Sequence, residues 1–223
     1  EFELKPLTPI RRAIAARVTE SFHDIPQFDL HLEADASALK AVRARYKAAG
    51  DPVVPGYNDM VMFTCSRVLE RHRGLNAHYT VEGIKVFSEV NVGFAVATGQ
   101  GVLLPVIRRA GVLGLEEISA RAAGMSELAR EMKLRASLQM HATFTVSSLG
   151  GFGIDSFNAV LSPPQVAILA TGAVIEKPVA RDGRLATAPV MHLTLTVDHR
   201  AVDGAEAAAF LTDLKQALEK FDA

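Results

Sequence analysis

The chain has 223 residues, 49% of them hydrophobic and 22% charged, and a formal net charge of −1. This length allows a sizeable core, and the balanced charge leaves no basic excess for binding nucleic acid. There is neither an apolar run of about 20 residues nor a signal-peptide pattern, so we expect no membrane association. The sequence begins with Glu rather than Met, which indicates a fragment of a longer polypeptide.

The first half of the sequence predicts helices and short strands. Thr8 and Pro9 open a helix, because threonine is a good N-cap and proline suits the first helical turn. After Pro26, apolar residues alternate with polar ones, as in a half-buried strand. The next elements expected are a helix from Asp35 to about Ala48, a helix from Asn58 or Asp59 to near Gly74, and a hairpin around Val81-Glu82-Gly83.

The second half predicts a larger share of strand. Val90 to Ala97 has the pattern of one strand, and Pro105 marks an edge or a break in the apolar run that follows. Amphipathic helices are expected from Gly114 to Lys133 and from Gly204 to Lys220. Strands are predicted at Phe144–Leu149, Val166–Thr171, Val174–Ala180 and Leu185–Val197, the last two joined by a turn at Arg181-Asp182-Gly183-Arg184.

These elements mix helices and strands without a regular βαβ repeat. The mixture favours an α/β two-layer sandwich, with a mostly mixed sheet covered by helices, over a doubly wound fold. The sequence contains no internal repeat and no low-complexity linker, so we expect residues 1–223 to form a single domain.

The only cysteine and the histidine spacing argue against metal or thiol chemistry. Cys65 lies in an apolar stretch and is expected to be a packed, inert thiol in a reducing compartment. None of the seven histidines is spaced from another as metal ligands usually are, so no metal site is expected.

His199 differs from the other histidines in its position. It follows an apolar strand that ends at Val197, and a helix is expected from Gly204. A strand-to-helix junction can present a functional side chain from a rigid support, where nearby Asp198 and Asp203 can orient the ring. On spacing alone, two interpretations stay open: a functional histidine, or a polar junction in which Asp203 merely caps the next helix.

Ser147 and Ser148 end another predicted strand, just before a glycine-rich turn. Serine hydroxyls in such a place can donate hydrogen bonds to an oxyanion. The alternative is a serine turn that orders the loop, and the local sequence favours that alternative.

A longer sequence pattern favours the functional interpretation of these residues. Residues 198–204, Asp-His-Arg-Ala-Val-Asp-Gly, resemble the active-site signature of the dihydrolipoamide acyltransferases, which form the cores of the 2-oxo acid dehydrogenase complexes and are related in fold to chloramphenicol acetyltransferase. Companion blocks occur in the family's order at residues 6–15, 25–28, 144–150 and 162–169. In the second block, Gln27 replaces the family's usual histidine. The resemblance covers nearly the whole chain.

The resemblance implies a site between the subunits of a homotrimer, which the family often assembles into a larger cage. His199 is then the general base on the thiol of coenzyme A or of dihydrolipoamide, and Ser147 of a neighbouring subunit stabilises the tetrahedral oxyanion. Asp203 orients the site. The chain is then the acyltransferase catalytic domain alone, and lipoyl-lysine is carried on another domain, because no lipoyl-lysine motif occurs here.

Residues 149–157 look most like the acetyl-transferring, pyruvate dehydrogenase-type members, so acetyl transfer is favoured. Partners are then a lipoyl domain and other subunits of the complex. The location expected is the cytoplasm of a bacterium, or the mitochondrial matrix in a eukaryote.

Three departures from the family pattern concern cofactor contacts and assembly. The helix around Phe63 lacks the family's frequent lysine, and His141-Ala142 stands where the family often has two glycines. For the phosphates of coenzyme A, Arg108 and Arg109 are candidates, although they equally fit solvated loop residues, and Ser148 is a further candidate contact. Residues 218–223 are short and partly charged, which leaves the larger cage open.

Two other functions stay open. One is a free-standing small-molecule O-acetyltransferase, in which the same histidine activates an alcohol. The other is a non-catalytic scaffold core of a multienzyme complex, although an intact His199 argues against it.

Overall fold

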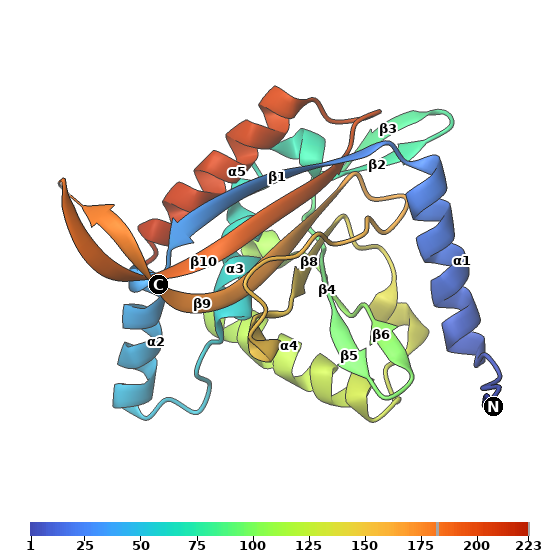
Figure 1. Ribbon diagram of the computed structural model, residues 1–223, viewed down its shortest axis with the longest axis horizontal. Coiled ribbons are helices and arrows are strands. Elements are labelled where there is room, and N and C mark those ends of the chain that lie inside the picture. Colours follow the sequence, from blue (N-terminus) through green and yellow to red (C-terminus); the bar gives the residue numbers. More distant parts are fainter. Residues whose placement is uncertain (182, 223) are drawn as a thin grey trace.

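A six-stranded mixed sheet forms the centre of the computed structural model, which describes residues 1–181 and 183–222. Figure 1 shows β1, β10 and β9 side by side, with the end of the β9–β10 hairpin extending away from the body. Pairing is parallel between β9 and β8 and between β8 and β4, and antiparallel elsewhere. In sheet order the strands are β1 (Gln27–Asp35), β10 (Arg184–Asp198), β9 (Ala167–Arg181), β8 (Phe144–Ser148), β4 (Val92–Phe94) and β7 (Val106–Ile107).

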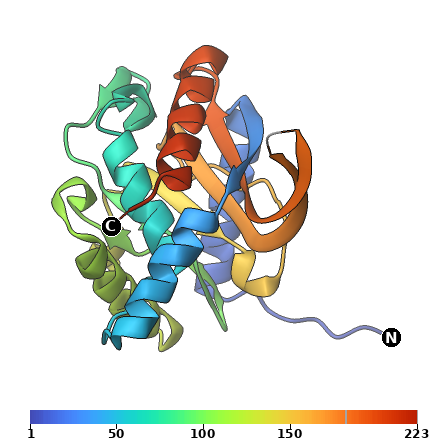
Figure 2. The same cartoon turned by 90° about the vertical axis from the view of Figure 1, so that its left-hand side faces the viewer.

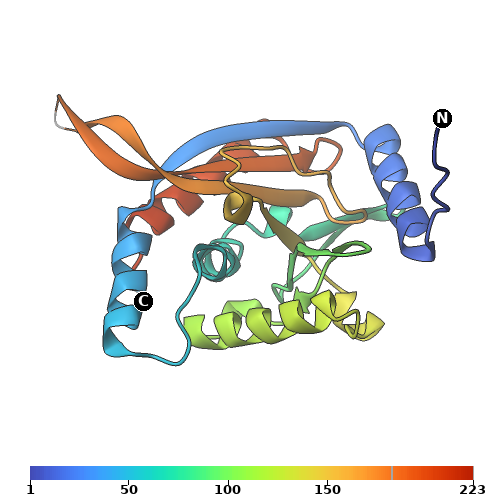
Figure 3. The ribbon, with the colours of Figure 1, turned by 60° about the horizontal axis from the view of Figure 1, so that its bottom comes forward.

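Helices cover one face of this sheet, which confirms the predicted two-layer α/β architecture (Figures 2 and 3). Along β10, Leu193, Leu195 and Val197 point into the main core, whereas Thr194 and Thr196 alternate with them on the outer face. The covering helices are α2 (Ser37–Ala49), α3 (Tyr57–Val68), α4 (Leu115–Arg130) and α5 (Gly204–Glu219), while α1 (Pro9–Asp24) lies at one end of the sheet.

Smaller elements complete the described chain. Two separate two-stranded sheets are formed by β2 (Ala77–Thr80) with β3 (Gly83–Val86), and by β5 (Val96–Thr98) with β6 (Gly101–Leu103). Short 3-10 helices are η1 (Arg73–Leu75), η2 (Ala110–Val112), η3 (Ala136–Gln139) and η4 (Gly150–Phe152). None of the helices in the described residues is long and apolar enough to cross a membrane.

Local capping explains where the helices begin. The Thr8 hydroxyl accepts a hydrogen bond of 3.1 Å from the amide of Arg11, as expected for an N-cap. Asp35 lies one residue before Ala36, the N-cap of α2, and its carboxylate accepts from the amide of Ser37 at 2.8 Å. The predicted end of α3 near Gly74 was wrong, because this helix ends at Val68 and Gly74 lies in the separate 3-10 helix η1.

Two strand predictions were also wrong. The stretch expected as one strand from Val90 to Ala97 divides at Ala95, because β5 pairs with β6 in a sheet of its own. Conversely, the two strands expected after Val166 form one continuous strand, β9, since the long β10 pairs with it on both sides of Gly172. In the turn predicted between β9 and β10, Asp182 lies outside the described residues.

An irregular segment, residues 157–162, covers part of the outer face of the sheet. Its Ala159 and Leu161 pack with Ile168 and Ala170 of β9 in a small second apolar cluster. Just beyond, the carbonyl oxygen of Asp155 lies 1.6 Å from where a Cβ on Gly172 would be, so only glycine fits at this crossing. This segment forms a wall of the cavity described below.

Candidate active site

The last residue of β10 anchors the turn that carries His199. Asp198 is only 1% exposed, and its carboxylate accepts hydrogen bonds from the amide of Arg200 at 3.0 Å and from its Nε and a terminal nitrogen at 2.9 and 2.8 Å. The guanidinium also donates to the carbonyl of Asp24 at 2.9 Å and lies 4.1 Å from the ring centroid of Tyr79. The hydrogen bond with Asp198 raises the pKa of Arg200, so the guanidinium stays charged, and its contacts fix the turn to α1 and β2.

His199 projects from this fixed turn. Its amide donates to the carbonyl of Pro26 at 3.0 Å, and its ring lies 4.5 Å from the ring of Phe28, centroid to centroid, with an interplanar angle of 37°. The side chain is exposed, and within the described residues neither ring nitrogen has a hydrogen-bond partner. Backbone and ring plane are therefore held while both nitrogens remain able to exchange a proton.

Asp203 stands at the N-cap position of α5, but its side chain makes no capping hydrogen bond. Only its backbone carbonyl serves the helix, accepting from the amide of Ala207 at 3.0 Å. Asp203 thus occupies the N-cap position that the alternative interpretation expected, but only its backbone contributes to the cap. Its exposed carboxylate lies at the same junction as His199, where it can accept hydrogen bonds from a partner outside its own helix.

Ser147 lies near the end of β8, where two cavities meet. An apolar cavity of about 330 Å³ lies on the outer face of the sheet and contains Ser147 with Ile14, Val18, Phe157 and Leu161 among its lining side chains. A polar cavity of about 800 Å³ contains Ser147 and Ser148 with Asn58, Ser119, Glu127 and Arg130. The Ser147 hydroxyl has no hydrogen-bond partner in the described residues, so it is available as a donor in both cavities.

Ser148 plays a different part in the structure. Its hydroxyl accepts from the amide of Gly150 at 3.4 Å and lies 3.5 Å from the carbonyl of Thr171, which is a serine turn. The local interpretation of these two serines therefore fits Ser148 and not Ser147.

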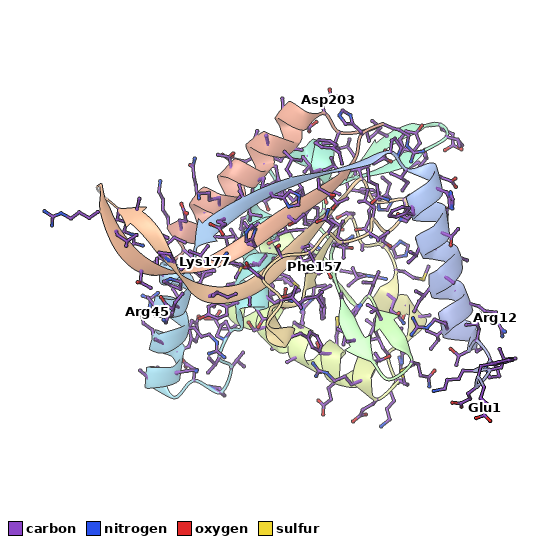
Figure 4. All side chains as sticks on the ribbon, in the orientation of Figure 1. Glu1, Arg12, Arg45, Phe157, Lys177 and Asp203 are labelled. Atoms are coloured by element: carbon purple, nitrogen blue, oxygen red, sulfur yellow. The ribbon has the colours of Figure 1, made fainter. Side chains whose placement is uncertain are left out.

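Within one chain, Ser147 and His199 lie far apart. Ser147 pairs with Ala170 of β9, and Ala170 pairs with Thr194 of β10, so His199 lies five residues beyond the level of Ser147 and two strands across. At a rise of roughly 3.3 Å per residue and a strand spacing of roughly 4.8 Å, the two residues are about 19 Å apart. Figure 4 shows Asp203 at the start of α5, at the upper edge of the view, and Phe157 of the apolar cavity nearer the middle of the molecule.

Comparison with known proteins identifies the family of the chain. Residues 1–223 match the family described as 2-oxoacid dehydrogenases acyltransferase (catalytic domain). The chain belongs to this family.

Individual relatives and structures extend the match. The chain is 36% identical, over 98% of its length and 46% of the relative's, to the dihydrolipoyllysine-residue acetyltransferase component of the mitochondrial pyruvate dehydrogenase complex of Schizosaccharomyces pombe. It is 34% identical, over 96% of its length and 55% of the relative's, to the acetyltransferase component of the acetoin cleaving system of Bacillus subtilis. The chain thus spans about half the length of the curated relatives it matches.

Among solved structures, the chain resembles an Azotobacter vinelandii dihydrolipoamide acetyltransferase, determined to investigate the role of a serine, a histidine and an asparagine in its catalytic mechanism. The TM-score is 0.95 at 31% identity, over 99% of this chain and 92% of that one. A chloramphenicol acetyltransferase matches with a TM-score of 0.57 at 16% identity, over 91% of this chain and 94% of that one, which confirms the predicted fold.

In this acyltransferase domain, the two arginines expected at coenzyme A phosphates have local partners. Arg108 donates to the carbonyl of Ser137 at 2.9 Å, and Nε of Arg109 lies 3.5 Å from a carboxylate oxygen of Glu89. The pairing of β7 with β4 and of β4 with β8 puts Arg108 toward the opposite end of β8 from Ser147, about 16 Å away at ordinary strand spacings. Their role in phosphate binding stays a prediction.

Cys65 is fully buried in the main core, and burial raises the pKa of its thiol, as expected for an inert cysteine. Among residues 1–181 and 183–222, no group of three or more His, Cys, Asp or Glu side chains is placed to hold a metal ion.

Several residues of the site were not identified from the sequence. Asn58 and Arg130 line the polar cavity from α3 and α4, and in the described part of the chain Oδ1 of Asn58 is buried without a hydrogen-bond partner. Burial raises the pKa of the neighbouring Asp59 carboxyl, which accepts from the amide of Gly56 at 2.8 Å. The Asn58-Asp59 pair was visible as a helix start, but which cavity that helix end faces depends on tertiary packing.

Proposed function

We propose that this domain transfers an acetyl group between coenzyme A and a dihydrolipoyl group. One observation carries the proposal. In the A. vinelandii acetyltransferase the histidine under investigation follows the serine by 52 residues and precedes the asparagine by four, and Ser147, His199 and Asp203 have the same two separations. The names of the relatives support acetyl as the acyl group.

In the proposed reaction His199 removes the proton from the attacking thiol. A free thiol has a pKa of roughly 8.5 and is mostly protonated at neutral pH, so a base held beside it increases the thiolate concentration. The thiolate sulfur attacks the thioester carbonyl and a new carbon–sulfur bond forms. When the tetrahedral intermediate collapses, the original carbon–sulfur bond breaks, and the departing thiolate takes the proton back from the imidazolium.

Ser147 stabilises the oxyanion of that intermediate in this proposal. Its hydroxyl has no partner in its own chain and lies where the two cavities meet, so it can donate to a developing negative charge. Asp203 occupies the position of the asparagine in the A. vinelandii protein. An ionised carboxylate only accepts hydrogen bonds, so Asp203 is assigned an orienting role rather than that of a second donor.

The active unit is proposed to be a homotrimer. Because Ser147 and His199 of one chain are about 19 Å apart by strand register, a site that uses both must take them from different copies. Cyclic arrangements in which each copy presents one surface to the next close into a ring, which completes one such site at every interface. Assembly of trimers into a larger cage is left to measurement, although a similar structure is the cubic core of a pyruvate dehydrogenase complex.

The two cavities suggest which substrate takes which route to Ser147. The lipoyl arm is largely hydrocarbon, which suits the apolar cavity lined by Ile14, Val18 and Phe157. Coenzyme A carries amides in its pantetheine arm and phosphates beyond it, and both suit the polar cavity, where Asn58 Oδ1 lacks a partner in the described residues and Arg130 offers positive charge. Arg108 and Arg109 remain candidates for phosphates that extend further.

Partners and location belong to the same proposal. Since the curated relatives are about twice as long as this chain, we assign it the role of the catalytic domain, with lipoyl-lysine supplied by another domain or polypeptide and with further subunits of an oxo-acid dehydrogenase complex as partners. Relatives are found in mitochondria and in bacteria, so the location follows the source organism.

Acyl acceptors decide between the proposed function and a small-molecule O-acetyltransferase. The protein is incubated with acetyl-CoA and either dihydrolipoamide or a panel of alcohols, and free coenzyme A is measured. We expect release of coenzyme A with dihydrolipoamide and only background with the alcohols. Release with alcohols alone would contradict the proposal, and no release with either acceptor would favour the scaffold.

A further inference from the structure

Gln27 lies between the His199 turn and the apolar cavity. It is the first residue of β1 and pairs with Asp198, and the carbonyl of the preceding Pro26 accepts the amide of His199 at 3.0 Å. Its side chain points to the other side of this junction, toward α1 and the segment 157–162. The two walls of the apolar cavity on the outer face are therefore within its reach.

The glutamine amide closes a ring of hydrogen bonds. Its Nε2 donates to the carbonyl and the hydroxyl of Ser21 at 2.9 and 3.1 Å, and its Oε1 accepts from the amide of Leu161 at 3.2 Å. The Ser21 hydroxyl in turn donates to the carbonyl of Leu161 at 2.7 Å. Ser21 is fully buried and Leu161 is 2% exposed, so these partners replace water entirely.

The ring matters because Leu161 lies outside regular secondary structure. Both of its backbone polar groups depend on side chains from α1 and β1, and an unpaired buried amide or carbonyl is costly. Leu161 belongs to the segment that supplies Phe157, Ala159 and Val160 to the apolar cavity, whereas α1 supplies Ile14 and Val18. The ring thus fixes the distance between the two walls.

We infer that Gln27 is a positioning residue that sets the width of the apolar cavity and thereby the affinity for the lipoyl arm. The inference rests on the proposed function for the substrate that enters this cavity. The glutamine suits the role because one side chain supplies both a donor and an acceptor in fixed geometry, without changing charge with pH. Ser147 itself is held by the β8–β9 ladder, so its position does not depend on the ring.

Steady-state kinetics test the inference. In Gln27→Glu the acceptor for Leu161 remains, but the donor toward Ser21 is replaced by an oxygen that faces another oxygen. We expect the KM for dihydrolipoamide to rise about tenfold, the factor that one lost hydrogen bond of ordinary strength carries, with kcat and the KM for acetyl-CoA changed less than about twofold. Gln27→Ala should raise the same KM further, and Gln27→His, which keeps one donor and one acceptor, should restore part of it.

Gln216→Glu is the matched control, because Gln216 is exposed on α5 and its side chain makes no hydrogen bond in the described residues. Equal increases in both KM values, or a fall in kcat alone, would overturn the assignment.

Hydrogen exchange gives a readout that does not depend on activity. The amide of Leu161 should exchange faster in Gln27→Ala than in the wild type, while peptides from β8 keep their protection. If the wild type fails to acetylate dihydrolipoamide, the proposed function is wrong, whereas unchanged exchange at residues 157–162 would show that the ring itself does not hold the segment.

Discussion

The His199 turn and the end of β8 are fixed in different ways. The turn depends on one buried carboxylate, Asp198, whose bonds to Arg200 hold an exposed imidazole at a junction of three elements. Ser147 depends on strand pairing with β9, and its hydroxyl faces cavities already shaped by apolar and polar walls. One region presents a base to solvent and the other presents a pocket without a base. In the proposed reaction each region is half of a site, and the variants below test this division.

Loss of the base should have the largest effect. In His199→Ala we expect acetyl transfer to dihydrolipoamide to fall by about 10³, within the range of a removed general base. His23→Ala is the control, because His23 is an exposed histidine on α1. A His199→Ala variant with activity within a fewfold of the wild type would contradict the assignment of His199 as the base.

Substitution of the two adjacent serines should have clearly different effects on activity. Ser147→Ala is expected to lower kcat by about 10²–10³, the usual cost of removing one oxyanion donor. Ser148→Ala loses only the weak serine turn at Gly150, so a change of less than about fivefold is expected. Stopped assays at saturating substrate distinguish the two, and a larger loss in Ser148→Ala would reverse their roles.

Mixing the two inactive variants tests whether the halves come from different copies. When His199→Ala and Ser147→Ala chains are coexpressed, a heterologous ring of three that contains both variants has one interface where both residues are intact. Random assembly then restores about a quarter of the wild-type activity. A mixture as inactive as its parents, with trimers confirmed by sedimentation, would mean that the two residues do not meet across an interface.

Much of the fold was predictable because its signals are local. Thr8 and Asp35 mark helix starts, since a cap acts within three residues, and the sequence pattern placed β8 and the closing helix closely. The division at Ala95 and the continuity of β9 through Gly172 were not predictable, because both depend on which strands pair with them.

The candidate site likewise has features that the sequence predicted and features that it did not. Family resemblance predicted Ser147 and His199 as site residues, but no spacing along the chain reveals that two strands, and about 17 Å along the strand direction, separate them. The ring of hydrogen bonds at Gln27 joins α1, β1 and the segment 157–162, and no sequence pattern indicates it. Both features depend on contacts between residues far apart in the sequence, which the sequence alone does not predict.

Arg200 tests how firmly the His199 turn is held. Arg200→Met leaves the Asp198 carboxylate buried without its partner, which should lower the free energy of unfolding by about 2–3 kcal/mol. The estimate lies at the low end for a buried pair because the Arg200 side chain is 32% exposed. Activity should fall as well, and Arg200→Lys should lie between. Urea unfolding measures the change, and an unchanged midpoint would mean that the pair does not stabilise the turn.

The smallest effect is expected at His78, which connects the two regions. Its Nε2 donates to the carbonyl of Ala142, just before β8, at 2.8 Å, and its neighbour Tyr79 lies under Arg200. Burial lowers the pKa of His78, so the unfolded chain binds a proton more readily than the folded one. The resulting contribution to stability is complete above the ordinary histidine pKa of roughly 6.5 and is lost as the pH falls through the lower pKa of the folded state.

His78→Gln removes this proton uptake while keeping a donor for Ala142. The unfolding midpoint should therefore fall less between pH 7 and pH 5 than in the wild type, by a margin smaller than the effect of Arg200→Met. His23→Gln, on an exposed histidine, should leave the slope unchanged. If the His78→Gln slope equals that of the wild type, acid weakens the molecule elsewhere, and the contact between β2 and the start of β8 does not couple the two half-sites to pH.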